Sequence, residues 1–360
     1  MTRSLKPLVA AFGALTLALT TMTVAAVPAR AADPKAATAA VAWLADPAQM
    51  TTAAGDAASA SDALIAFAAV KDPSTADEVA TLVESLRTTG AEYAGGDVAA
   101  AAKLAVALEA VGQNPRTFLP GMDLIAAVRD GVQEDGAVGA FPSPFSSGMA
   151  AVALARADEA VPAPVMTYLL QRQRTDGGFV STLDDLDWSG KPVVPDADNT
   201  GMGLLALLAD DAAAPDAKAS AIAWAAQNQA TDGAWEGWNR ANSTAVMGSA
   251  LASAGENVDK AVAFLVTQQQ PSGAFVSSNP TTGDTFDDAL TTTQAVLLLA
   301  GVSYLDVAWP NPAQPSSPGP HAATPTTPGA PGMEPWLVGG VVVLLLGGAA
   351  VLVVRRRART

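Results

Sequence analysis

The side chains of this 360-residue chain that could carry chemistry are carboxylates, amides and hydroxyls. There is no cysteine, and the single histidine, His321, lies in a proline-rich segment near the C-terminus. Thiolate nucleophiles and Ser–His–Asp or Cys–His triads therefore have no residues to form from. What remains is hydrogen bonding to a ligand, proton transfer by a carboxyl group and the binding of a hard cation by oxygen ligands.

One acidic loop, 185–196, has the ligand order of a calcium-binding loop. Oxygen-bearing residues occupy its positions 1, 3, 5 and 12, a glycine occupies position 6, and Asp replaces the usual Glu at position 12. The four predicted ligands are Asp185, Asp187, Ser189 and Asp196. Two prolines in its second half favour an ordinary solvated acidic turn, so Ca²⁺ is the alternative and no other cofactor is expected.

Three polar clusters each precede a stretch rich in small apolar residues. They are Asp198-Asn199-Thr200, Asn242-Ser243-Thr244 and Thr291-Thr292-Thr293-Gln294. Such residues are typical caps of helix N-termini, and capping accounts for most of them. The neighbouring carboxylates Asp287 and Asp288 also suit a helix N-terminus, where the helix dipole favours negative charge.

An internal repeat must position these groups. Residues 168–179, 224–235 and 264–275 share one template, in which an aromatic residue is followed by Gln five positions later, Gly four after that, and an aromatic residue two after the Gly. The shared positions are Gln173, Gly177 and Phe179, then Gln229, Gly233 and Trp235, then Gln269, Gly273 and Phe275. Gly suits a positive φ after a helix, Gln can bond loose backbone groups, and the aromatic can cover them. We predict a structural role for the template.

The whole body reads as helix, because Ala and Leu are abundant and apolar residues recur at helical spacing. We predict six helix pairs. The second pair carries a template fragment at Gly90-Ala-Glu-Tyr93, the third carries one at Gly139-Ala-Phe141, and Ser61-Asp62 is the predicted start of a helix. The predicted helices outside the template copies are 36–45 and 61–70, 76–87 and 97–111, 122–132 and 147–157, 199–209, 242–254 and 292–301.

Six pairs can stack in an open array or close into a ring. Open arrays usually end in polar capping repeats. Trp43, Leu44 and the run Ile65-Ala-Phe67 are apolar at the start of this body, which favours a closed ring with the first repeat packed on the sixth.

The three template copies resemble the glutamine–tryptophan repeats of squalene–hopene cyclases, and more broadly the terpenoid-cyclase and protein-prenyltransferase superfamily. The resemblance implies an all-α fold, an α6/α6 toroid of six inner and six outer helices with a ligand cavity at one mouth. Vitamin B12 carriers and complement thioester domains are similar. Zinc catalysis of the prenyltransferase kind and thioester chemistry both need a cysteine that this chain lacks.

Class II cyclases of this superfamily use an Asp-x-Asp-Asp acid at the mouth of the ring. The nearest match considered is Asp284-Thr-Phe-Asp287-Asp288, in which Asp287 would be the proton donor and Thr285 replaces the first Asp. No histidine is near to orient it. We therefore expect Asp287 and Asp288 to be ordinary charges at a helix N-terminus, with a reduced cyclase or lyase as the alternative.

In a closed ring the polar clusters would converge on one mouth with free N–H groups directed inward. Aromatic side chains in the connecting loops would add apolar contacts, as in small-molecule sites. The alternative for the tryptophans is packing under the loops. The candidate ligand-binding residues are Trp188, Asp198, Asn199, Trp235, Trp238, Asn242, Asp287, Asp288 and Thr292.

The two ends of the chain predict export and membrane attachment. Residues 1–31 have a basic start, an apolar run and a small-x-small end, as a signal peptide does. Residues 336–354 are uncharged and long enough to span a bilayer, and the basic tail 355–360 belongs on the cytoplasmic side. Between residues 309 and 335 a proline-rich linker predicts an extended stalk. Residues 32–308 are then an extracellular domain.

Charge excludes one class of partner. Residues 32–354 contain 35 acidic and 13 basic residues, a net charge of −22 that repels phosphate backbones. We therefore expect no nucleic acid partner. The sequence as a whole predicts a non-catalytic cell-surface protein that binds a small molecule or a surface partner at the mouth of the toroid, with a corrinoid as one specific alternative.

Overall fold

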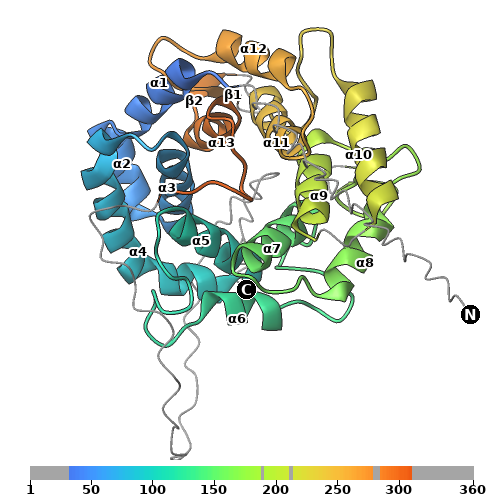
Figure 1. The fold of residues 1–360 in the computed structure, drawn as a ribbon, viewed down its shortest axis with the longest axis horizontal. Coiled ribbons are helices and arrows are strands. Elements are labelled where there is room, and N and C mark those ends of the chain that lie inside the picture. Colours follow the sequence, from blue (N-terminus) through green and yellow to red (C-terminus); the bar gives the residue numbers. More distant parts are fainter. Residues whose placement is uncertain (1–31, 188–189, 211–213, 279–283, 310–360) are drawn as a thin grey trace, which may run out of the picture.

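A computed structural model describes residues 32–187, 190–210, 214–278 and 284–309. In this part of the chain the α-helices number thirteen, and they form two concentric layers around one axis (Figure 1). The predicted signal peptide, span and tail, and nearly all of the linker, lie outside the described residues. No helix within the described ranges is both long and apolar enough to cross a membrane.

The inner layer is a closed ring of six helices. Each inner helix contacts the next one, and the last contacts the first. The inner helices are α3 (Ala57–Val70), α5 (Val98–Ala110), α7 (Pro144–Arg156), α9 (Ala197–Ala209), α11 (Arg240–Ser253) and α13 (Ala289–Leu299).

The outer layer supplies the other member of each pair, and the first pair has two outer helices. A 3₁₀ turn, Pro73–Thr75, leads into α4. A short hairpin of β1 (Val276–Ser278) and β2 (Thr285–Asp287) precedes α13, with Ser277 paired to Phe286. The outer helices are α1 (Pro34–Leu44), α2 (Pro47–Gly55), α4 (Ala76–Gly96), α6 (Leu124–Asp130), α8 (Ala163–Arg172), α10 (Pro215–Asn228) and α12 (Asp259–Gln268).

Small residues let the inner helices approach closely. A Cβ on Gly148 of α7 would lie 2.6 Å from the carbonyl oxygen of Met202 on α9. One on Gly201 of α9 would lie 3.1 Å from the Met247 backbone on α11. The inner helices are consequently buried on nearly all sides, which explains their Ala-rich and weakly amphipathic sequences.

The template forms a hydrogen-bonded turn in all three predicted copies. The Gln Nε2 donates to the carbonyl of the template Gly at 2.9 Å in the first two copies and 3.0 Å in the third. The Gly residues have φ of 97°, 96° and 98°. The closing aromatic side chain is buried. These contacts are the ones expected of a structural turn.

The same turn joins each repeat to the next. Gln173 Nε2 also donates to Ala217 O of α10, at 2.9 Å. Gln269 Nε2 donates to Ala36 O of α1 at 2.8 Å, and Asp33 N donates to Leu299 O at 2.8 Å. The first repeat therefore packs on the sixth, as the apolar start of the body predicts.

Two predicted template fragments were misplaced. Gly90 lies inside α4, where Leu104 packs against it, so the segment from Gly90 to Tyr93 is helix and not a turn. In the third repeat the turn is Asp135-Gly136-Ala137-Val138. There Gly136 has φ of 86°, and a Cβ on it would lie 1.9 Å from Pro164 O. Valine replaces the aromatic in this copy, which is why the sequence pattern missed it.

Two features of the first repeat also differ from prediction. Ser61 and Asp62 do not start a helix, because α3 begins at Ala57 with Asp56 as its cap. Asp46 caps a separate helix, α2, between the two predicted helices of this repeat.

The segment that follows α13 runs across the inside of the ring (Figure 1). Arg156 of α7 donates to Tyr304 O at 3.1 Å and to Val307 O at 2.9 Å, and Trp309 N donates to Ala110 O at 2.6 Å. Residues 302–309, which we term the plug, thus contact the C-terminal ends of α5 and α7. They close that end of the ring.

We expect Gly273→Ala to destabilise the protein more than Gly255→Ala. Both glycines have positive φ, but a Cβ at Gly255 meets nothing within 4 Å, whereas one at Gly273 would lie 2.2 Å from Ala39 O. The strain at Gly255 should cost about 1–2 kcal/mol, and the added backbone clash at Gly273 should bring the loss to about 3 kcal/mol or more. Denaturant unfolding of the two variants measures the difference. Equal losses in the free energy of unfolding would contradict the close approach of Gly273 to Ala39 O.

Candidate functional site

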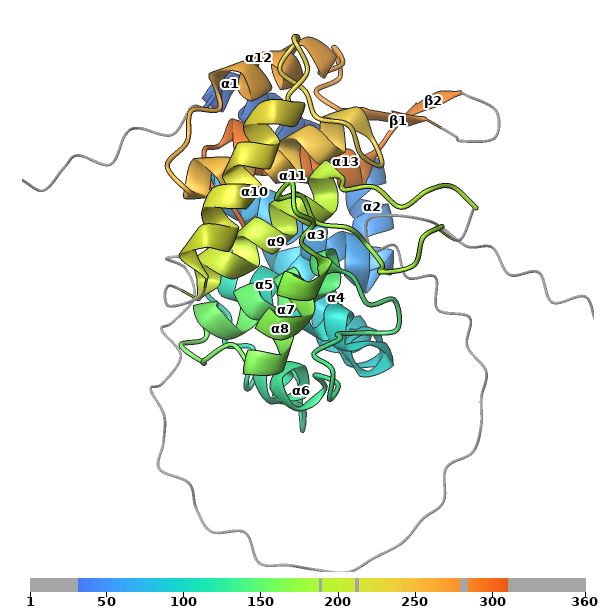
Figure 2. The same ribbon diagram turned by 90° about the vertical axis from the view of Figure 1, so that its right-hand side faces the viewer.

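The N-terminal ends of the inner helices gather at one end of the ring, which we term the mouth. Consecutive repeats are bonded there: Ala140 N, just before α7, donates to the α5 cap Asp97 at 2.6 Å. Trp238 N, just before α11, donates to Asp198 of α9 at 3.0 Å, and Asn239 Nδ2, the α11 cap, donates to Val276 O at 3.1 Å. The β hairpin and the loop before α9 project from this end (Figure 2).

The predicted polar clusters do not cap these helices. The caps are other residues two or three positions before the clusters, and each accepts a backbone N–H of the first turn. The clusters occupy the first turns themselves and are buried. The caps of α9, α11 and α13 are Asp196, Asn239 and Asp288.

One member of each cluster belongs to the template. Phe179 N donates to Thr200 Oγ1, Trp235 N to Thr244 Oγ1, and Phe275 N to Thr292 Oγ1, at 3.0, 3.0 and 2.9 Å. Thr292 was a predicted ligand-binding residue, and the structure places it in this scaffold bond.

Asp198 is the most unusual group at the mouth. Its Oδ2 accepts from Trp238 N and from Ser243 Oγ, at 3.0 and 2.8 Å. Its Oδ1 is buried and has no hydrogen-bond partner within the described ranges. The side chain of the next residue, Asn199, donates to Asp196 at 2.8 Å, while Asn199 Oδ1 is likewise buried and unpartnered there. Two acceptor oxygens on consecutive residues thus lack a hydrogen-bond donor.

Burial and, to a smaller extent, the nearby Asp196 carboxylate raise the pKa of the Asp198 carboxyl from 3.8 to about 7. Burial also raises the pKa of Asp196, although hydrogen bonds from Asn199 oppose this shift. A carboxyl group with a pKa near neutrality can accept a hydrogen bond when ionised and donate one when protonated.

Below the mouth, a buried polar network crosses the inside of the ring. Asn242 of α11 donates to Gln294 of α13, and Lys103 of α5 pairs with Asp62 of α3 at 2.5 Å. Burial raises the pKa of Tyr304, from the plug, and Asp62, Lys103 and Gln294 all act on it. These groups satisfy one another, so Asn242 serves the interior and not the mouth surface.

The remaining predicted ligand-binding residues divide between core and surface. Trp235 is buried, and its Nε1 donates to Ala225 O at 2.8 Å, so it packs under the loop. Trp238 is 51 % exposed beside the mouth. Asp288 caps α13, whereas Asp287 lies on the exposed strand β2. Trp188 lies outside the described residues.

The predicted calcium ligands are not brought together as a set. Asp196 Oδ1 accepts from Asn199 N at 2.8 Å as the helix cap, while Asp187 Oδ1 accepts from Lys191 N at 2.9 Å within a tight loop. Asp185 is exposed, and Ser189 lies outside the described ranges. The part of the chain that the structure describes holds no group of three or more acidic or histidine side chains placed to bind a metal ion.

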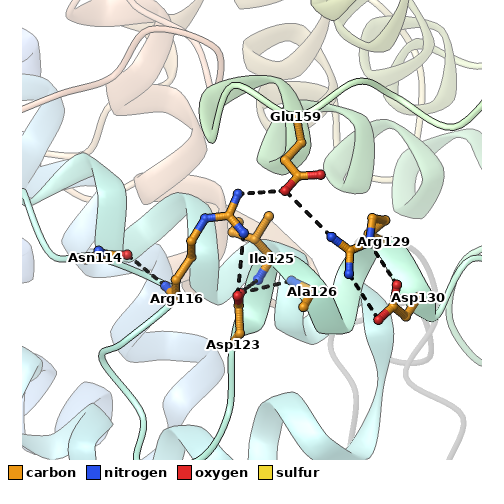
Figure 3. Close-up of polar contacts among 8 residues, drawn as sticks. All are labelled: Asn114, Arg116, Asp123, Ile125, Ala126, Arg129, Asp130 and Glu159. Atoms are coloured by element: carbon orange, nitrogen blue, oxygen red, sulfur yellow. Dashed lines mark hydrogen bonds and ion pairs between the residues drawn. The ribbon is translucent and has the colours of Figure 1, made fainter. Parts of the chain in front are cut away.

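The opposite end of the ring offers a competing cavity of about 500 Å³, lined in part by Glu109, Asn114, Arg156 and Asp306. Its charges are largely paired: Arg156 binds Glu109 at 3.1 Å. Nearby, Arg116 bonds Glu159 at 2.8 Å and Asp123 at 3.5 Å, and Arg129 bonds Asp130 (Figure 3). These ion pairs join loops to α6 and are structural.

A second segment also resembles the Asp-x-Asp-Asp pattern. Asp196-Ala-Asp198-Asn199, at the start of α9, carries two of the three aspartates, with Asn at the last position. The segment Asp284-Thr-Phe-Asp287-Asp288 carries two of the three as well, because Thr285 replaces the first. Its two aspartates lie on the exposed strand β2 and at the cap of α13.

No family model and no curated protein matches this chain. Solved structures define its class as an α/α-toroid fold. The type II terpene cyclase MstE from Scytonema superposes with a TM-score of 0.54 at 18 % identity, covering 74 % of this chain and 96 % of the cyclase. Haptocorrin in complex with Cbi gives 0.50 at 11 % identity, covering 76 % of this chain and 67 % of haptocorrin. At these identities the likeness shows the fold alone.

We expect Asp198→Asn to flatten the pH dependence of stability. The folded protein holds this proton up to about pH 7, whereas the ordinary pKa is 3.8. The contribution of Asp198 to stability should therefore be greatest below pH 3.8, fall by up to about 1.4 kcal/mol per unit as pH rises toward 7, and then level off.

Denaturant unfolding at several pH values checks this difference between the natural protein and Asp198→Asn. Asp216→Asn, an exposed change in the first turn of α10, is the matched control and should keep the natural slope. Parallel curves for all three proteins would show that Asp198 ionises normally.

Proposed function

We propose that this protein binds a small molecule at the mouth of the toroid, and that Asp198 and Asn199 recognise it. The observation that carries the proposal is the pair of buried acceptor oxygens, Asp198 Oδ1 and Asn199 Oδ1, without partners in the described part of the chain. A buried polar atom without a partner costs about 1–3 kcal/mol. A bound ligand that donates hydrogen bonds would recover this cost.

The chemistry of the site defines the ligand class. Hydrogen-bond acceptors on two consecutive residues suit a ligand with two hydrogen-bond donors, such as an amide, an amine or a pair of hydroxyl groups. Trp238, exposed beside Asp198, offers an apolar surface to the body of such a ligand. The net charge of −22 over residues 32–354 favours a neutral or cationic molecule over an anion.

The proposal includes the place of action. An apolar leader at 1–31, a proline-rich stalk at 309–335 and an apolar run with a basic tail support an exported domain tethered to the outer face of the cell membrane. A tethered binding protein would capture its ligand, or a surface partner, outside the cell.

Native mass spectrometry of protein purified from its natural host tests the proposal. We expect a retained small molecule, and Asp198→Ala should weaken its binding by about 10- to 100-fold, because a hydrogen bond to a charged group contributes about 1.5–3 kcal/mol. Asp287→Ala, on the exposed strand β2, is the control and should bind normally. Haptocorrin was solved with Cbi, so Cbi is the first compound to titrate. Equal retention by both variants would contradict the site.

A second candidate is acid catalysis by Asp198. The position of Asp198 in the pattern Asp196-Ala-Asp198-Asn199 and its pKa of about 7 support it. A carboxylic acid that keeps its proton near neutrality can protonate a substrate. The buried network of Asn242, Gln294 and Tyr304 occupies the inside of the ring, and this makes binding the better supported function.

Incubation with geranylgeranyl dihydroxybenzoate, the substrate bound to the Scytonema cyclase, tests the second candidate. Catalysis predicts a chromatographically distinct product, lost in Asp198→Asn and kept in Asp287→Asn. Unchanged substrate with the natural protein would count against catalysis on this substrate and leave the binding test standing.

A further inference from the structure

Large apolar side chains are exposed mainly at the mouth end of this protein. Of the eight described ones that are well exposed, two lie on the outer helices, Leu170 of α8 and Val266 of α12. The other six lie on the loops and the β hairpin that precede inner helices, and we term them the rim. The rim consists of Phe141, Leu183, Leu186, Val194, Trp238 and Phe286, each between 48 % and 66 % exposed.

The rim is one arc over four neighbouring repeats. Its residues precede α7, α9, α11 and α13, which follow one another around the ring. None of the six rim residues precedes α3 or α5. The loop before α9 and the hairpin before α13 stand out from this end in side view (Figure 2).

Hydrogen bonds hold the rim segments in place. Trp238 N is bonded to Asp198, Asn239 Nδ2 donates to Val276 O of β1, and Val193 N donates to Asp185 O in the loop before α9. The loops that expose these apolar side chains are therefore held by hydrogen bonds. Clustered exposed apolar residues on an ordered surface mark interaction sites.

Acidic residues alternate with the apolar ones. Asp184 and Asp185 lie between Leu183 and Leu186, and Asp287 follows Phe286. All three carboxylates are exposed, and none forms an ion pair within the described ranges. The exposed basic residues of the described loop before α9 are Arg174, in the template turn, and Lys191.

We propose that the rim docks a cationic, amphipathic segment of a partner protein, with its apolar side chains on the rim and its Lys or Arg residues against Asp184, Asp185 and Asp287. Charge complementarity selects this occupant. An anionic lipid surface would be repelled by the carboxylates. A second copy of this chain would bring the same carboxylates and a net charge of −22 against them. The proposal concerns side chains other than the Asp198 oxygens and goes beyond small-molecule binding.

Fluorescence anisotropy with a labelled 18-residue Leu/Lys amphipathic peptide tests this docking on the full chain in detergent. We expect saturable binding that weakens as salt rises, and a charge-reversed Leu/Glu peptide should not bind. Replacing Leu186, Trp238 and Phe286 with Ser should weaken binding at least 10-fold. Replacing Asp184, Asp185 and Asp287 with Asn should weaken it and remove most of the salt dependence.

Leu170→Ser/Val266→Ser is the matched control, because these residues are 38 % and 40 % exposed on the outer helices. It should bind the Leu/Lys peptide as the natural protein does. Two further measurements use the same variants: flotation with phosphatidylserine vesicles and mass determination by light scattering.

Three results would each overturn the proposal. The first is equal binding of the Leu/Lys and Leu/Glu peptides, or no binding of either. The second is binding that survives in the Ser triple variant. The third is vesicle binding or self-association by the natural protein that is lost in the Ser triple variant and kept in the Leu170→Ser/Val266→Ser control. Loss of small-molecule retention in Asn199→Ala, which leaves the bond between Asp198 and Trp238 N in place, together with intact peptide binding, would separate the two sites.

Discussion

The fold depends on one contact that recurs in the ring. In it, a glycine, which has no Cβ, packs directly against a backbone carbonyl of the next outer helix. Gly136, Gly177 and Gly233 approach carbonyls on α8, α10 and α12, and Gly273 approaches Ala39 O on α1. Any side chain there would clash with backbone. The last contact brings the sixth repeat to the first, and the Gln269 bond to Ala36 O holds it there.

This contact has a consequence for recognition. Four consecutive repeats meet the next outer helix in this same way. Their inner helices run in parallel, so the N-terminal ends of these helices share one mouth. Backbone N–H groups and polar first turns gather there, and caps such as Asp97 bond across to the next repeat. The mouth therefore combines rigidity with polar groups, whereas the plug closes the other end through Arg156. Asp198 stands out because its repeat leaves one carboxylate oxygen unpaired.

In the functions that we propose, the mouth and the rim divide recognition between the inner helices and the loops. Asp198 belongs to an inner helix, so its environment is buried and its pKa is raised. Leu186 and Phe286 belong to a loop and a hairpin that add nothing to the core, which leaves their apolar surface exposed. A small donor ligand suits the first environment, and a cationic apolar segment suits the second.

The local sequence predicts the helical repeats and the turns at Gly177, Gly233 and Gly273, because these depend on short-range backbone geometry and on apolar periodicity. The apolar start of the body favours a closed ring, and long-range contacts of Gln269 and Gly273 with α1 form the closure. Which carboxylates lie at the mouth depends on tertiary contacts alone. Asp287, two residues from a helix start, faces solvent on β2, while Asp198 is buried because Trp238 N and Ser243 of the next repeat bond to it. Contacts between repeats, forty or more residues apart in the chain, set that burial, and no local pattern encodes them.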